Sequence, residues 1–128
     1  MMLSYAWVAL GGALGSVARF WMADAVAAVA GPTFPWGTLG INIIGSFVIG
    51  LFYALTGPGG RFDLSSDLRT FVMVGLCGGF TTFSSFSLQT LLLLQDGHPL
   101  RAGGYILGSV SLCLLFVWLG SLIAFQRA

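Results

Sequence analysis

Four long stretches without a charged residue dominate the pattern of the chain. They cover residues 1–18, 25–60, 70–95 and 102–126. A helix that crosses the hydrocarbon core of a bilayer needs about 20 mainly apolar residues. Each stretch holds one such helix and is too short for two comfortable ones. The pattern therefore predicts an all-α membrane protein with four transmembrane helices.

Helix breakers and capping residues place the ends of these helices. Gly31-Pro32 ends the first helix, and Pro35 suits the opening turn of the second, where its missing N–H is not needed. The glycine-rich segment 57–60 ends the second helix, and Asp67 is the expected N-cap of the third. The helices are predicted at residues 4–29, 35–55, 67–95 and 99–126. The connections are too short for a second domain, so residues 1–128 form one four-helix transmembrane domain.

The composition supports a membrane location. Hydrophobic residues make up 57% of the chain and charged residues only 7%, whereas soluble proteins carry about 25% charged residues. A net charge of +1 provides no basic surface for nucleic acid. We expect a multi-pass protein of the cell (inner) membrane, surrounded by lipid. The few arginines are divided almost evenly between the two ends of the helices, which favours insertion in both orientations.

Small residues recur four positions apart on all four helices, which predicts close helix packing. In lipid, association depends on close backbone approach through such residues, because the hydrophobic effect no longer drives it. Four short helices have little interior of their own. We therefore expect some of the grooves formed by these small residues to pack against helices of the same chain and others to contact a second copy. The pairs are Gly11/Gly15, Gly12/Ser16, Ser46/Gly50, Gly75/Gly79 and Gly104/Gly108.

Residues 75–87 of the third helix read Gly-Leu-Cys-Gly-Gly-Phe-Thr-Thr-Phe-Ser-Ser-Phe-Ser, the least helical segment of any span. The pattern predicts a break that frees carbonyl oxygens. At membrane depth such oxygens need protein or a bound ion as a partner, and Na⁺ is one candidate. Phe80, Phe83 and Phe86 recur every three residues. This stripe either packs against a neighbouring helix or turns its electropositive ring edges toward a small anion.

Two further polar side chains lie within the first two helices. Asn42 shares one face of its helix with Thr38 and Ser46. It either donates to an anion without adding charge or forms an ordinary interhelical hydrogen bond. Arg19 either raises the local potential for an anion or has a structural role, reaching the interface or a neighbouring helix end.

The fourth helix adds hydroxyl groups, with Tyr105 and Ser109 one turn apart and Ser111 two residues further. No acid lies along this polar line, since Asp24 is near a helix end and the only histidine, His98, lies in a turn. No base is placed to activate a serine, so no catalytic constellation is expected. A proton-coupled carrier is also disfavoured, because it needs a carboxylate inside the membrane.

Three segments closely resemble the Fluc (CrcB) family of microbial fluoride channels. They are Gly-Gly-Ala-Leu-Gly-Ser-Val-Ala-Arg-Phe at 11–20, Gly-Thr-Leu-Gly-Ile-Asn-Ile-Ile-Gly at 37–45 and Gly-Phe-Thr-Thr-Phe-Ser-Ser-Phe-Ser at 79–87. The similarity extends over all four helices. It implies an antiparallel, dual-topology homodimer with two fluoride pathways near the subunit interface. Members export fluoride passively and so protect the cell from its toxicity.

The resemblance also implies roles for individual residues. Phe83 and Phe86 correspond to the phenylalanines whose ring edges line the pores, and Asn42 corresponds to the pore asparagine. The remaining pore positions are Thr38 and the hydroxyl groups of Tyr105, Ser109 and Ser111, and Arg19 corresponds to the family's first-helix arginine. The family also has a structural Na⁺ at the dimer centre, bound by backbone carbonyls. These correspond here to Gly78 and Thr81 or, one residue further, to Gly79 and Thr82.

Two other functions compete with the channel. A small multidrug exporter is also a four-helix, dual-topology protein, but it needs a glutamate in its first helix and this chain contains none. A scaffold subunit would use the glycine grooves to bind other helices. It would conduct no ion and would tolerate substitution of Asn42 or Phe83.

Overall fold

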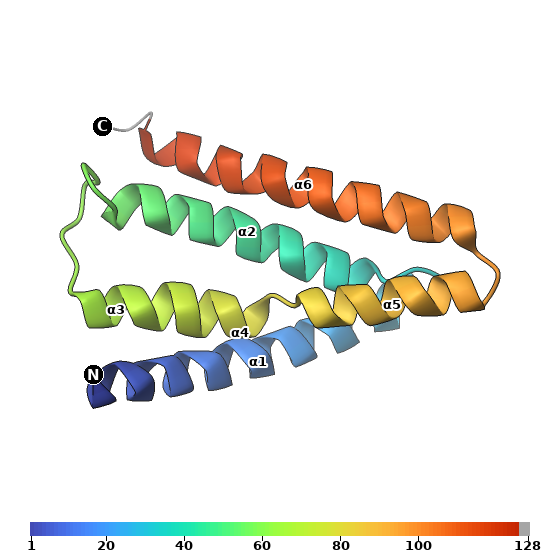
Figure 1. Ribbon diagram of the computed structural model, residues 1–128, viewed down its shortest axis with the longest axis horizontal. Helices are drawn as coiled ribbons and strands as arrows, with labels where there is room; N and C mark the ends of the chain where they lie inside the picture. The colour runs from blue at the N-terminus through green and yellow to red at the C-terminus, as the bar shows by residue number, and fades with distance from the viewer. Residues whose placement is uncertain (126–128) are drawn as a thin grey trace.

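The structure is a computed structural model that describes residues 1–125, and all the regular secondary structure in them is helical. Four long helical rods run side by side (Figure 1). The first is α1 (Met2–Ala30) and the second is α2 (Trp36–Thr56). The third is built from α3 (Ser66–Thr70), the π-helix η1 (Phe71–Cys77), α4 (Gly78–Phe80) and α5 (Phe83–Gln95), and the fourth is α6 (Pro99–Phe125).

The four predicted spans are confirmed, because all four rods are long and apolar enough to cross a membrane. Their ends lie within two residues of the predicted ones, except that residue 126, the predicted end of the fourth, is outside the described residues. The N-terminus and the α2–α3 connection lie at one end of the bundle (Figure 1). The α1–α2 loop and the α5–α6 turn lie at the other end.

The N-cap predicted for the third rod is wrong by two residues. Ser65, not Asp67, caps α3, and its Oγ accepts a hydrogen bond of 3.3 Å from the Leu68 amide. Ser65 has extended backbone angles (φ −58°, ψ 150°), which let its side chain reach back to the first turn. Asp67 already lies inside that turn, and its Oδ1 accepts a hydrogen bond of 3.2 Å from Ser4 Oγ on α1.

A seam of glycines joins α1 to η1 and α4, and we call these residues (Gly11, Gly15, Gly75 and Gly79) the glycine seam. A Cβ atom added at Gly75 would lie 2.8 Å from the Gly11 Cα, and one added at Gly11 would lie 2.9 Å from the Gly75 Cα. Only residues without a side chain allow the two backbones to approach this closely. The small-residue pairs of the first and third helices therefore pack within the chain.

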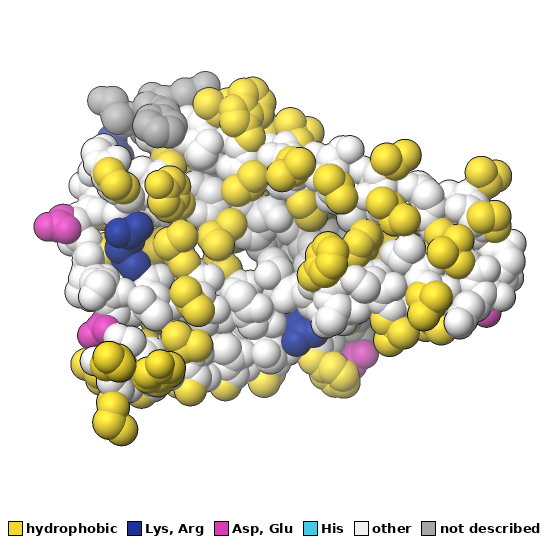
Figure 2. Space-filling model, in the orientation of Figure 1, with side chains coloured by type: hydrophobic (Ala, Val, Ile, Leu, Met, Phe, Trp, Pro, Cys, Tyr) yellow, Lys and Arg dark blue, Asp and Glu magenta, His cyan; other side chains and the backbone are white. Residues whose placement is uncertain are grey.

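Other surfaces of the chain lack such a partner. A Cβ atom added at Gly104 or Gly108 on α6 would meet no atom within 4 Å. Hydrophobic side chains are spread along the whole length of the displayed face, with few charges between them (Figure 2). The core is small, since Tyr105 and Ile41 are the largest fully buried side chains of the described residues. Such a surface suits lipid and a neighbouring protein rather than water.

Candidate functional site

The third rod is broken at Thr81 and Thr82, which confirms the predicted break. Both residues are extended, with φ −81°, ψ 156° at Thr81 and φ −151°, ψ 113° at Thr82. Thr82 then starts α5 as its N-cap, because its Oγ1 accepts a 3.1 Å hydrogen bond from the Ser85 amide. The wide turns of η1 precede the break, and π-turns of this kind often occur at functional sites.

The Asn42 side chain on α2 bridges the break. Its Oδ1 accepts a hydrogen bond of 2.8 Å from the Thr82 amide, and its Nδ2 donates one of 3.1 Å to the Thr82 carbonyl. Asn42 thus supplies the acceptor that the Thr82 amide would find at the Gly78 carbonyl in an unbroken helix. The interhelical hydrogen bond considered for this residue is present. One N–H of the amide remains for another acceptor.

The break takes the usual helical donor away from two carbonyl oxygens, those of Gly78 and Thr81. In a continuous helix the Thr82 amide would donate to Gly78 O and the Ser85 amide to Thr81 O. Both amides donate elsewhere, to Asn42 Oδ1 and to Thr82 Oγ1.

The alternative pair of carbonyls is already satisfied. Gly79 O accepts from Arg19 Nε at 3.1 Å and from Ser16 Oγ at 3.5 Å. Thr82 O accepts from Asn42. Arg19 therefore has the structural role considered for it, because it compensates for the lost helical partner of Gly79.

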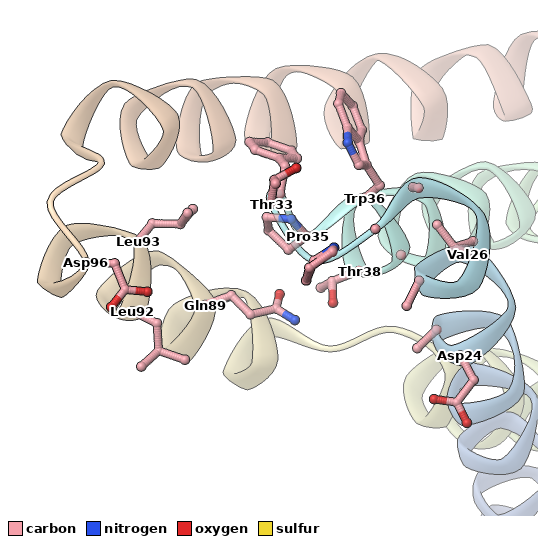
Figure 3. A pocket seen from close by; sticks show the side chains of 17 residues that line it. Asp24, Val26, Thr33, Pro35, Trp36, Thr38, Gln89, Leu92, Leu93 and Asp96 are labelled. Atoms are coloured by element: carbon pink, nitrogen blue, oxygen red, sulfur yellow. The ribbon is translucent and has the colours of Figure 1, made fainter.

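Three cavities follow one another along the broken rod. The mouth cavity, of about 440 Å³, lies beside the α1–α2 loop and α5, and Asp24, Thr38, Gln89 and Asp96 are among its lining residues (Figure 3). The arginine cavity, of about 290 Å³, shares Thr38 and Gln89 with it and adds Arg19.

The third cavity lies past the break and shares Thr82 with the arginine cavity. We call it the phenylalanine cavity, because Phe83 and Phe86 line it together with Asn42 and Ser109. Its volume is about 390 Å³, and no carboxylate occurs among the described residues that line it. The shared residues make the three cavities neighbours, and Arg19 lines the middle one while Asn42 and the phenylalanine rings line the third.

Aromatic rings line the series on the side of α5 and α6. The centroids of Phe83 and Phe86 are 5.4 Å apart, and those of Phe86 and Tyr105 are 5.0 Å apart. Phe83 leaves 77% of its surface exposed, whereas Tyr105 is fully buried. Within the predicted stripe, Phe86 therefore packs against the core at Tyr105, whereas Phe83 faces outward beside the phenylalanine cavity.

The hydroxyl groups predicted on α6 do not all lie together. Tyr105 donates a 2.8 Å hydrogen bond to Gln89 Oε1. Ser109 is only 7% exposed, and its Oγ has no partner among the described residues. Ser111 is exposed, because two residues along a helix turn a side chain to nearly the opposite face. The residue that continues the line of Tyr105 and Ser109 at i+8 is Cys113, which lines the phenylalanine cavity.

A family model described as "CrcB-like protein, Camphor Resistance (CrcB)" matches residues 6–121. The chain belongs to the CrcB family. A CrcB relative from Methylocella silvestris is 57% identical over 122 residues, covering 95% of this chain and 93% of its own length. A second relative, from Paramagnetospirillum magneticum, is 58% identical and the match covers 96% of this chain and 96% of its own length. A third, from Opitutus terrae, is 59% identical and the match covers 94% of this chain and 91% of its own length. All three are named "Fluoride-specific ion channel FluC".

Membership of the CrcB family tests the predicted family, the predicted membrane location and the expectation that the chain is not an enzyme. The resemblance seen in the sequence is confirmed, and this CrcB chain is a multi-pass membrane protein, not an enzyme. Two lining residues of the cavities, Gln89 and Cys113, were not among the predicted site residues. Helical spacing identifies both in retrospect, since Cys113 lies two turns after Tyr105 and Gln89 lies one turn after Ser85.

Proposed function

We propose that this chain is a fluoride-selective channel that exports fluoride passively across the cell inner membrane and confers fluoride resistance. One observation supports the pore more than any other. The phenylalanine cavity combines the unpartnered Ser109 hydroxyl, the Asn42 amide and two phenyl rings, with no carboxylate among its described lining residues. Relatives named as fluoride channels share 57–59% of its residues over almost the whole chain.

The chemistry of this cavity suits a small, strongly hydrated anion. Fluoride loses its water shell in a narrow pore, and polar donors must replace that shell without holding the ion too tightly. Ser109 and the free N–H of Asn42 are uncharged donors, and ring edges add a weak positive potential. A fixed positive charge would bind more strongly, and Arg19 lies one cavity away, bonded to Gly79. The proposed pathway comprises Thr38, Asn42, Phe83, Phe86, Tyr105 and Ser109.

The proposal includes an antiparallel, dual-topology homodimer in which each chain (residues 1–128) is a single domain. The phenylalanine cavity is incomplete in one chain, because Phe83 is 77% exposed beside it. Gly104 and Gly108 on α6 are open to close approach by another helix. The even division of arginines favours opposite orientations of the two copies. Two such chains would have two pores near their interface.

The proposal also includes a structural Na⁺ at the dimer centre, bound by the carbonyls of Gly78 and Thr81. These oxygens have lost their helical donors, whereas those of Gly79 and Thr82 accept hydrogen bonds from Arg19 and Asn42. The free pair supports the first of the two registers considered. A hard cation prefers oxygen ligands, and a carbonyl at membrane depth needs a partner.

Fluoride efflux from proteoliposomes, read with a fluoride electrode, tests the channel. We expect rapid fluoride release and no chloride release from matched vesicles. Well-incorporated protein that releases no fluoride would overturn the channel and favour the scaffold.

The sodium site is tested separately by exchanging Na⁺ for N-methylglucamine during purification. The dimer should weaken, and a dimer of unchanged stability with no trapped Na⁺ detected by elemental analysis would overturn that site.

A further inference from the structure

Sulfur-containing side chains gather around the phenylalanine cavity. Both cysteines of the chain, Cys77 and Cys113, line it, together with Met73. Cys77 and Met73 come from η1 and Cys113 comes from α6. Both thiols are free. Among the described residues no group of three His, Cys, Asp or Glu could hold a metal ion.

The two thiols differ in their access to the cavity. Cys77 is 5% exposed, whereas Cys113 is partly exposed. Cys113 lies one turn after Ser109, whose hydroxyl is buried in the same cavity without a partner among the described residues. An unpartnered buried hydroxyl is costly unless the cavity takes up a polar ligand. A solute that enters the phenylalanine cavity and reaches Ser109 therefore also reaches the Cys113 thiol.

We propose that Cys113 anchors a binding site for soft monovalent cations such as Ag⁺, and that occupation of this site closes the passage. Thiolate and thioether sulfur select soft metal ions, and few other side chains do. Binding forms a sulfur–silver bond and releases the thiol proton to water, without oxidation or reduction. The Met73 thioether is a second soft ligand on the cavity wall. Closure of the passage rests on the proposed channel function, whereas metal binding does not.

Inhibition of fluoride efflux by Ag⁺ in chloride-free nitrate buffer tests the proposal. The three proteins are the wild type, Cys113→Ser and the matched control Cys77→Ser, each normalised to its own uninhibited efflux. Wild type and Cys77→Ser should be blocked at the same Ag⁺ concentration. Cys113→Ser should need at least about tenfold more, because a hydroxyl is a poor ligand for a soft ion. Equal sensitivity of Cys113→Ser, or resistance of Cys77→Ser, would overturn the proposal.

Native mass spectrometry of the same proteins gives a second measurement that does not depend on transport. We expect one silver adduct per chain in wild type and Cys77→Ser, and none in Cys113→Ser. The same adduct in all three proteins would remove the assignment to Cys113. If no protein transports fluoride but the adduct pattern holds, the channel function fails and the metal site stands.

Discussion

The glycine seam and the phenylalanine cavity both involve the third rod, and they differ in how far the chain satisfies its own polar groups. At the seam, α1 and η1 approach until a single Cβ would lie 2.8 Å from the opposite backbone. The Gly79 carbonyl there accepts from Arg19 and Ser16. In the phenylalanine cavity, which is lined by α2, the third rod and α6, the Ser109 hydroxyl has no partner among the described residues.

From this difference we infer that the glycine seam stabilises the fold and that the phenylalanine cavity serves transport. A membrane protein must satisfy its backbone internally, and the seam does so through close packing and the Arg19 side chain. The cavity leaves the Ser109 hydroxyl without a partner among the described residues, and we propose that an ion or a second copy supplies one. Substitutions on the two sides should therefore fail in different ways, at the seam by loss of folding and at the cavity by loss of transport.

The largest effect is expected at the seam, from Gly11→Ala. The new Cβ would lie 2.5 Å from the Phe71 carbonyl oxygen and 2.9 Å from the Gly75 Cα, and neither backbone atom can move aside. Overpacking of this kind costs about 1–3 kcal/mol, enough to lose much of the folded protein. Size-exclusion chromatography in detergent should show a strongly reduced folded peak. Gly12→Ala is the matched control, because its Cβ meets nothing within 4 Å, and equal yields of the two would contradict the seam.

Asn42→Asp should have the next largest effect, on transport. The carboxylate keeps the acceptor for the Thr82 amide but replaces the donor that reaches the Thr82 carbonyl. Two oxygens then face each other, the free N–H is lost, and a negative charge enters the cavity. Losing two hydrogen bonds of about 1 kcal/mol each lowers fluoride efflux by about 30-fold. Proteoliposome efflux is the measurement, and near-normal flux from Asn42→Asp would remove Asn42 from the pathway.

Phe83→Ile and Phe86→Ile should lower efflux by about tenfold each, because an aromatic edge contributes up to about 1.4 kcal/mol to such contacts. The dimer should stay intact, as judged by its elution volume. Phe116→Ile is the control, since Phe116 packs against Phe47 at 6.4 Å between ring centroids and lines none of the three cavities. Equal flux in all three variants would exclude a pore role for the rings.

The helices were predictable because their signal is a property of whole segments. Hydrophobic stretches of 20 residues and glycine-rich breakers placed every described end within two residues. The break at Thr81 and Thr82 was also predictable, because paired glycines and threonines both disfavour helix. The π-helical turns of η1 had no sequence signal, since they depend on how the rod packs against α1.

The site was harder to predict because side-chain partners are decided in three dimensions. Asn42 was a clear polar outlier, but its two bonds to Thr82 depend on where α2 crosses the break. The carbonyl oxygens of Gly79 and Gly78 differ because the Arg19 side chain reaches Gly79 and donates a hydrogen bond to it. Cys113 was not among the predicted site residues, although its spacing from Tyr105 matched the hydroxyl line better than that of Ser111 did.

The smallest predicted effect separates the two serines of α6 and sharpens the contrast between the cavity and the outer surface. Ser109→Ala removes one buried, unpartnered hydroxyl from the cavity. A single hydrogen bond contributes about 1 kcal/mol, so fluoride efflux should fall by about fivefold. Ser111→Ala removes an exposed hydroxyl of the same size from the other face of the helix, and efflux should stay the same. The pair differs only in which way the helix turns each side chain. If Ser111→Ala slows efflux and Ser109→Ala does not, the pathway follows the exposed face of α6, and the polar line must be completed by the partner subunit.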